Sequence, residues 1–189
     1  MKTESLFTPL DTFQHAERAD FGTTWSCQSD RSLGGESQGE LHIFTEAKPA
    51  YLRLSGTVSL KNTLRPEDGG FIQAALPLLY ARHLYNASAY DGVRIRCALS
   101  PATDPTQGHY EIRLQTRELS MPWQYYGHAF QPTHQIQSLD LCFDDFQRVN
   151  TSHPLNPAYL LNLSVVAGQA VFSPELNIYE VGFYAHSHP

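Results

Sequence analysis

The chain has 189 residues, of which 41% are hydrophobic and 17% are charged, a composition typical of a globular protein and not of a disordered chain. Its formal net charge of -6 argues against non-specific nucleic-acid binding, which depends on neutralising phosphates with Lys and Arg. No apolar run approaches the roughly 18 residues that a membrane-spanning helix needs.

The first residues contain no apolar segment of the kind that forms a signal peptide. The three cysteines lie far apart in the sequence and form no C-x-x-C motif, which predicts reduced thiols in a cytoplasmic protein. Residues 1–24 are expected to form an N-terminal strap with little regular structure and at most one helical turn, between Gln14 and Ala19. Phe13 and Trp25 are the expected anchors of this strap.

A glycine-rich loop follows Trp25. Residues 29–39 read Ser-Asp-Arg-Ser-Leu-Gly-Gly-Glu-Ser-Gln-Gly, a composition that favours a shaped turn over a helix or strand. In one interpretation, Gly34 and Gly35 expose main-chain N–H groups to a ligand or partner, and Asp30 and Arg31 assist. In the other, Asp30 caps a tight turn, Arg31 pairs with a carboxylate, and the loop is architectural.

Short segments with alternating apolar and polar residues dominate the rest of the chain, and this period of two predicts β-strands. The segment 77–84 is the one stretch that resembles an apolar helix, with a long excursion covering a sheet as the alternative. Loops rich in Gly and Pro separate the strands. We therefore predict one domain over residues 1–189, an all-β antiparallel β-sandwich of jelly-roll type. The predicted strands lie in residues 41–44, 51–60, 71–74, 93–99, 110–115, 125–130, 139–143, 161–165 and 176–184.

Four arginines occupy outward-facing positions of the predicted strands: Arg53, Arg94, Arg96 and Arg113. If they shared one face, their guanidinium groups would suit an anionic ligand such as a carboxylate, a phosphate or an acidic sugar. The alternative is a solvated sheet face with cross-strand Arg–Glu pairs.

Aromatic residues form a second group of candidates. Trp123 follows Pro122 in a predicted loop, and Tyr125 begins the next strand, so the two rings could form a platform that stacks on a sugar. Packing in the core is the alternative fate of such rings.

Metal binding has weak support in the sequence. Nine histidines are scattered without H-E-x-x-H spacing, and His109, His128 and His134 would have to converge in the fold to form a site. No cofactor is expected, and whether a metal binds is open. A structural calcium ion on Asp91, Asp144 or Asp145 with loop carbonyls is the alternative.

Several motifs occur in a fixed order: the Asp-x-x-x-Gly-Gly-x-Ser loop at residues 30–37, Gly-Gly-Phe at 69–71, Tyr-Asp-Gly-Val at 90–93 and Leu-Cys-Phe-Asp-Asp-Phe at 141–146. In this arrangement the chain resembles the complex I intermediate-associated protein 30 family over roughly residues 13 to 184. It departs from the family pattern by Leu33 in place of Met and by an insertion at Thr63 to Asp68.

The resemblance implies a galactose-binding-like jelly roll, similar to family 11 carbohydrate-binding modules. It also implies a non-enzymatic assembly factor with a protein partner, linked in mitochondrial members to respiratory complex I. A module that binds carbohydrate or an anionic metabolite is the alternative function, and an uncharacterised enzyme is a third.

Overall fold

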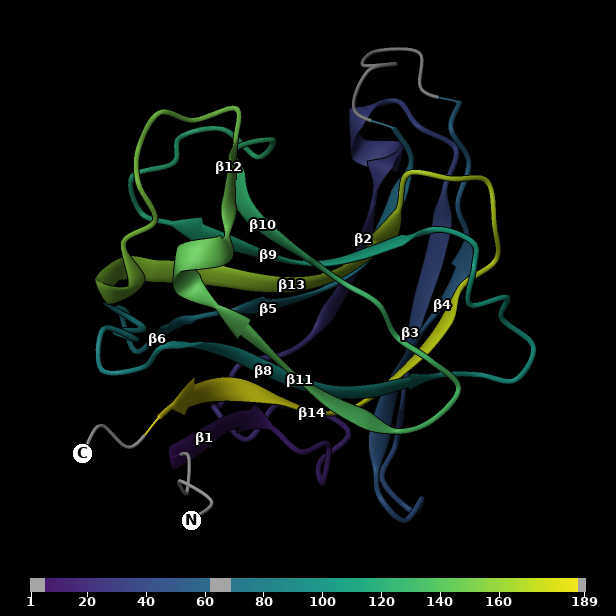
Figure 1. The fold of residues 1–189 in the computed structure, drawn as a ribbon, viewed down its shortest axis with the longest axis horizontal. Coiled ribbons are helices and arrows are strands. Elements are labelled where there is room, and N and C mark those ends of the chain that lie inside the picture. The colour runs from purple at the N-terminus through teal and green to yellow at the C-terminus, as the bar shows by residue number, and fades with distance from the viewer. Residues whose placement is uncertain (1–5, 62–68, 187–189) are drawn as a thin grey trace.

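The computed structural model describes residues 6–61 and 69–186, and two antiparallel sheets of six strands each form its body. In Figure 1, β9, β13 and β5 lie in one layer and β8, β11 and β14 in the other. The first sheet contains β1 (Leu6–Asp11), β3 (Gln38–Phe44), β4 (Tyr51–Thr57), β8 (Gly92–Leu99), β11 (Gln137–Cys142) and β14 (Glu175–Ala185). The second contains β2 (Ser26–Ser29), β5 (Phe71–Pro77), β9 (His109–Thr116), β10 (Tyr125–Phe130), β12 (Gln147–Val149) and β13 (Leu160–Gly168).

The predicted β-sandwich is therefore confirmed, and the alternation along each strand explains its core. On β9, Tyr110, Ile112 and Leu114 are at most 1% exposed, and Leu52 and Leu54 on β4 are fully buried across from them. Each such side chain contributes roughly 1.5–3 kcal/mol through removal from water. The residues between them on each strand point outward, so the two outer faces carry the polar and aromatic side chains.

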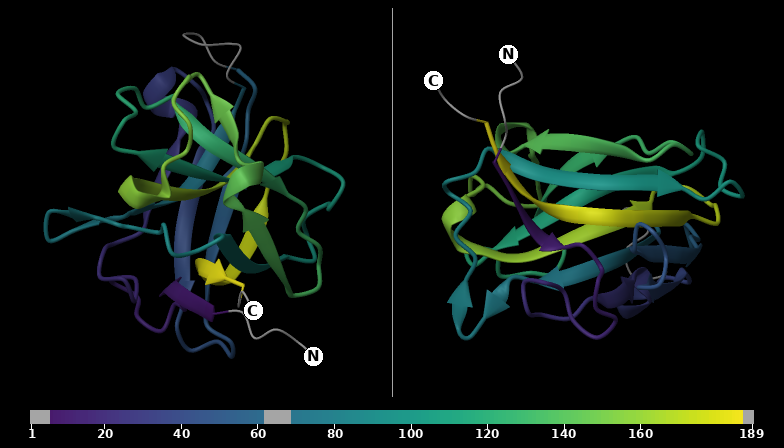
Figure 2. Two further views of the ribbon diagram at one scale, coloured as in Figure 1. Left: turned by 60° about the vertical axis from the view of Figure 1, so that its left-hand side comes forward. Right: turned by 90° about the horizontal axis from the view of Figure 1, so that it is seen from below.

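The N-terminal segment is more regular than the sequence suggested. Residues 6–11 form β1, which pairs antiparallel with β14, and Figure 2 shows this purple strand beside the yellow one. Residues 16–18 form a bend, and no helical turn occurs between Gln14 and Ala19. Phe13 and Trp25 are buried, as predicted, and Asp11 accepts hydrogen bonds from the Trp25 Nε1 at 2.7 Å and the Phe13 N at 2.8 Å. These bonds tie the segment to the core.

The expectation of a helix over residues 77–84 is wrong. The chain instead forms the hairpin of β6 (Leu79–Tyr80) and β7 (His83–Leu84). Ala81 and Arg82 both have positive φ, 49° and 69°, which is the backbone of a two-residue turn that matches the twist of paired strands. Tyr85 then bridges to Leu160 and returns the chain to the second sheet.

The three cysteines are free thiols. Within the described ranges, no helix has the length and apolar character required to cross a bilayer. The inserted segment Thr63 to Asp68 lies outside the described residues.

Candidate functional site

A groove crosses the outer face of the second sheet, and we call it the Arg113 groove after the residue at its centre. Its central hollow, around Arg113, has a volume of about 340 Å³. A larger and more open hollow of about 630 Å³ and a smaller one of about 130 Å³ continue it toward β2, and both share Phe71 and Pro122 with the central one. The central hollow is lined from the strands by Phe71, Arg113, Tyr125 and Val149, and from the loops by Leu33, Pro122, Trp123, Asn150 and Gln169.

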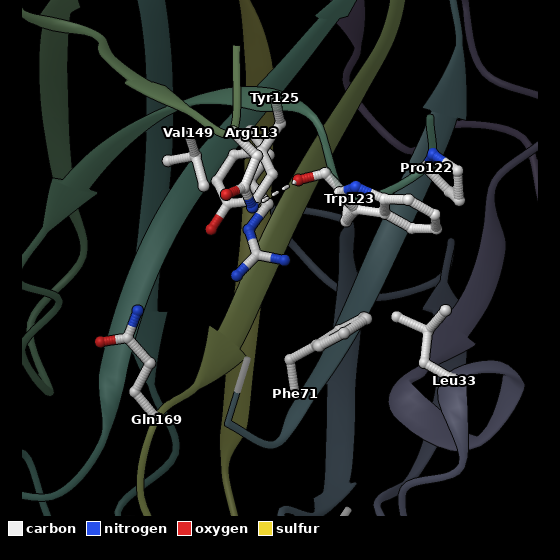
Figure 3. A pocket seen from close by; sticks show the side chains of 9 residues that line it. Leu33, Phe71, Arg113, Pro122, Trp123, Tyr125, Val149 and Gln169 are labelled. Atoms are coloured by element: carbon white, nitrogen blue, oxygen red, sulfur yellow. Dashed lines mark hydrogen bonds between the residues drawn. The ribbon is translucent and has the colours of Figure 1, made fainter. Parts of the chain in front are cut away.

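Arg113 is held in place by a carboxylate and two aromatic rings. Its Nε and Nη2 both lie 2.5 Å from Glu111 Oε1, because residues two apart on a strand share a face. The guanidinium carbon lies 4.2 Å from the centroid of the Tyr125 ring and 5.1 Å from that of Phe71. Figure 3 shows the guanidinium between these rings, with Trp123 and Leu33 on one side and Gln169 on the other. Cation–π contact of this kind stabilises a cation that is shielded from water.

Glu111 lies beneath the groove and is only 6% exposed. Burial acts to raise the pKa of its carboxyl, but His109 and Arg113 beside it together hold that pKa below its ordinary value. Gly127 on β10 makes room for it, because a Cβ at that position would come within 2.8 Å of Glu111 Oε2. The floor of the groove is therefore built around a buried, ionised Arg–Glu pair.

One wall of the groove is the loop that carries Trp123. Gln115 on β9 donates from Nε2 to the carbonyl oxygens of Pro122 and Gln124, at 3.3 and 3.2 Å. Asn150 Nδ2 donates to the Trp123 carbonyl at 3.3 Å, and Gln124 Nε2 donates to the Asn150 carbonyl at 3.0 Å. These bonds between side chains and main chain fix the half-buried Trp123 ring beside the Arg113 groove.

Two residues at the groove adopt left-handed backbone, Asn150 with φ 55° and Gln169 with φ 61°. Asn tolerates this conformation, whereas Gln adopts it at a cost in free energy. The Gln169 N–H donates to the Gly70 carbonyl at 2.9 Å and holds the turn between β13 and β14. Strained backbone of this kind clusters at functional sites, where neighbouring structure compensates for it.

The glycine-rich loop contributes to the groove mainly because it holds Leu33 in the lining. Asp30 opens a short 3-10 helix, Asp30–Leu33, and its fully buried carboxylate accepts hydrogen bonds from the Ser37 N and Oγ, both at 3.0 Å. Gly34 has φ 85°, and a Cβ on Gly35 would collide with the Asp30 carboxylate. Asp30, Gly34 and Gly35 thus shape the loop, Arg31 is exposed, and Leu33 reaches the groove.

The four arginines do not share one face, because β4 and β8 belong to the first sheet and β9 to the second. Arg53 donates from Nε to Asn177 Oδ1 at 2.9 Å, and Arg94 binds both carboxylate oxygens of Asp140, at 2.6 and 2.8 Å. Arg96 lies on the same strand as Arg94. Of the four, Arg113 alone lines the Arg113 groove.

The histidines proposed as metal ligands do not meet. His109 lies 3.7 Å from Glu111, the His128 ring packs on Phe146, and His134 Nε2 contacts the Thr103 carbonyl at 2.9 Å. Over the part of the chain that the structure describes, no three His, Cys, Asp or Glu side chains gather as a metal site would require.

Sequence reasoning identified Arg113, Trp123 and Tyr125 but not the residues that complete the groove. The sequence predicts a strand at Phe71 but no ligand role for it, and the strand predicted at residues 110–115 gives Glu111 no role either. The Glu-x-Arg spacing on one strand, opposite a glycine on the next, is the signal that could have located the floor. Asn150 and Gln169 gave no such signal, because backbone φ is not visible in the sequence.

Comparison with known proteins gives a family and a fold. The family model described as complex I intermediate-associated protein 30 matches residues 12–171. No curated protein matches the chain.

Among solved structures, the family 11 carbohydrate-binding module of the cellulosomal cellulase Lic26A-Cel5E of Clostridium thermocellum has a TM-score of 0.69 at 10% identity. The match covers 96% of this chain and 95% of that one. A family 11 module from the same organism, in complex with a β-1,3-1,4-mixed-linked tetrasaccharide, gives 0.68 at 10% identity, with 100% of both chains covered. The CBM22-1 xylan-binding domain of Paenibacillus barcinonensis Xyn10C gives 0.52 at 13% identity, covering 99% of this chain and 100% of that one. At these identities the likeness establishes the jelly-roll fold.

Proposed function

The chain belongs to the complex I intermediate-associated protein 30 family, and we propose that it acts as a non-catalytic binding module whose Arg113 groove binds a carbohydrate chain. Arg113, Trp123 and Tyr125 are the proposed ligand contacts. The observation that carries the proposal is the gathering of aromatic rings and amide side chains in one groove.

A location in the cytoplasm fits the thiols. All three cysteines are free, one of them exposed at Cys27, as the reducing environment of the cytoplasm would keep them.

The chemistry of the lining suits a sugar. The ring faces of Phe71, Trp123 and Tyr125 offer apolar surfaces on which the C–H faces of a pyranose can stack. The amides of Gln73 and Asn150 can donate to and accept from hydroxyl groups. An aromatic surface with a few fixed polar groups is the usual composition of a small-ligand site. The structural neighbour that holds a mixed-linked tetrasaccharide supports this ligand class.

Isothermal titration with mixed-linked glucan, xylan and mannan tetrasaccharides tests the proposal. We expect at least one of them to bind, and Trp123→Ala to weaken that binding about fivefold, since stacking on one ring contributes on the order of 1 kcal/mol. Tyr159→Ala is the matched control, because Tyr159 is an aromatic residue outside the Arg113 groove and is 43% exposed. Binding that is lost equally in both variants, or absent in the folded wild-type protein, would contradict the proposal.

A second candidate function is a protein contact during assembly of a respiratory complex, which the family membership favours. The β6–β7 hairpin offers a surface for it, because Leu79 is 45% exposed and Tyr80 is 52% exposed. We expect affinity purification from the native cell to retain respiratory-complex subunits on the wild-type protein and to lose them with Leu79→Ser. Val171→Ser, at a residue that is 70% exposed elsewhere, serves as the control. Retention of the same subunits by Leu79→Ser would exclude the hairpin as the contact.

A further inference from the structure

We infer that Glu111 sets the charge preference of the Arg113 groove, so that the groove accepts neutral hydroxyl-rich chains and rejects carboxylated ones. The inference rests on the proposed function, since it concerns the ligand of the same groove. An unpaired arginine between aromatic rings would instead favour carboxylated chains, because the guanidinium fork matches a carboxylate.

One edge of the Arg113 guanidinium is already occupied by a carboxylate. Nε and Nη2, one of the two donor pairs with which an arginine can grip a carboxylate, both bond to Glu111 Oε1 at 2.5 Å. The rings of Tyr125 and Phe71 lie against the guanidinium. An acidic sugar would have to displace Glu111 from this edge, or bind the other N–H edge beside a carboxylate of the same charge, whereas a hydroxyl group meets no such repulsion there.

Glu111 is held firmly in that position. The Glu111 side chain is 8% exposed and the Arg113 side chain 13%, so water screens the pair weakly. Gly127 leaves the space that the carboxylate occupies, and His109 lies 3.7 Å from its other oxygen. Rotation of Glu111 away from Arg113 would leave a buried arginine unpaired, which is costly.

The lining of the Arg113 groove has almost no net charge. Among the described residues that line the three hollows, Arg113 is the only one with a permanent charge, and Glu111 beneath it carries the opposite charge. The floor and walls therefore sum to about zero, and a carboxylated chain would meet no net positive potential in a protein with an overall charge of -6.

Titrations of a neutral β-1,3-1,4-linked glucan tetrasaccharide and of tetragalacturonate at pH 7 test this inference. The wild-type protein is expected to bind the neutral chain at least tenfold more tightly, with little dependence on salt. Glu111→Gln is expected to bind tetragalacturonate at least tenfold more tightly than the wild type does, with an affinity that falls as salt is raised. Its affinity for the neutral chain should change less than threefold.

Two further variants separate the possible causes. Glu175→Gln removes the same charge beside Arg53 on the first sheet, so it should not change either affinity. The double variant Glu111→Gln with Arg113→Gln removes both charges and should bind tetragalacturonate no more tightly than the wild type does, and a gain as large as that of Glu111→Gln would mean that Arg113 is not its cause.

Neutral-chain binding without any gain for tetragalacturonate in Glu111→Gln would overturn the inference and leave the proposed function standing. A wild-type protein that already prefers tetragalacturonate would do the same. If neither these two chains nor the xylan and mannan tetrasaccharides bind the wild-type protein or Glu111→Gln, both the proposed function and this inference fail.

Discussion

The two outer faces of the sandwich repeat one motif in different surroundings. On the first sheet, Arg94 pairs with Asp140 and lies 5.5 and 5.4 Å from the ring centroids of Phe7 and Tyr184. On the second sheet, Arg113 pairs with Glu111 and lies against Tyr125 and Phe71. An arginine fixed by a carboxylate and aromatic rings is therefore a stabilising feature of both faces and does not by itself indicate a ligand site.

The two arginine–carboxylate pairs differ in how deeply they are buried and in the loops that surround them. The Arg94 and Asp140 side chains are 20% and 34% exposed, against 13% and 8% for Arg113 and Glu111. Loops that carry Leu33, Trp123 and Gln169 rise around Arg113 and enclose the hollow. The walls, supplied by loops far apart in the sequence, therefore turn a common sheet-face motif into a candidate site.

The largest effect should come from truncating the two arginines. Arg113→Ala leaves the buried Glu111 carboxylate unpaired, which we expect to lower the free energy of unfolding by about 3–5 kcal/mol. Arg94→Ala leaves Asp140 partly in water, and the expected loss is about 1 kcal/mol. Urea denaturation of both variants measures the difference. Equal losses would mean that the two pairs do not differ in depth as described.

A smaller loss of stability should follow from a change in the loop that carries Leu33. In Gly35→Ala the added Cβ collides with the buried Asp30 carboxylate and disturbs its bonds to Ser37. Overpacking of this kind costs about 1–3 kcal/mol. Arg31→Ala, at an exposed position of the same loop, should change stability by less than about 0.5 kcal/mol. Thermal unfolding of the pair checks this, and a Gly35→Ala protein as stable as the Arg31→Ala protein would contradict the architectural role of the loop.

The same two faces show how far the sequence could be interpreted. Alternation along residues 93–99 and 110–115 placed Val93, Ile95, Ile112 and Leu114 in the core correctly, because the period of two follows directly from strand geometry. It could not reveal that the connection at residues 100–108 passes from one sheet to the other. For that reason the sequence leaves open whether the four arginines share one face.

The sequence also does not predict the short strands β1 and β2. β1 and β2 are defined by pairing with β14 and β5, which lie far away in the sequence, and β2 has only four residues. Such strands form because a partner edge is available, and local propensity says little about them. The walls of the groove follow the same rule, since Asn150 and Trp123 meet through hydrogen bonds between distant loops.

Acid should distinguish the buried pair from an exposed one. The pKa of Glu111 is held below its ordinary value in the fold, so the unfolded chain takes up the proton first as pH falls. The stabilisation is therefore present above the ordinary Glu pKa of about 4.3 and is lost as pH falls through the lower folded value. We expect the destabilisation by Glu111→Gln to be largest at pH 7 and to shrink below about pH 4.

Urea denaturation of the wild-type protein and of Glu111→Gln at pH 7, 5, 4 and 3 measures how the difference in their free energy of unfolding depends on pH. Glu175→Gln, at a side chain that is 38% exposed beside Arg53, should show a much smaller difference from wild type at every pH. A constant destabilisation by Glu111→Gln across the series would mean that the charge of Glu111 does not stabilise the fold.

The smallest expected effects are those of Gln169→Gly, a variant that separates the backbone strain at Gln169 from the contact of its side chain with a ligand. Gly at position 169 accepts φ 61° without the penalty that Gln has there, so Gln169→Gly should raise the free energy of unfolding by up to about 1 kcal/mol. The same change removes an amide from the lining and should weaken binding of the neutral tetrasaccharide by about two- to fivefold, the value of roughly one hydrogen bond. Urea denaturation and calorimetric titration of one variant give both numbers. A gain in stability with unchanged affinity would remove Gln169 from the ligand contacts, and a loss of stability would show that its side chain, and not its backbone, holds that wall.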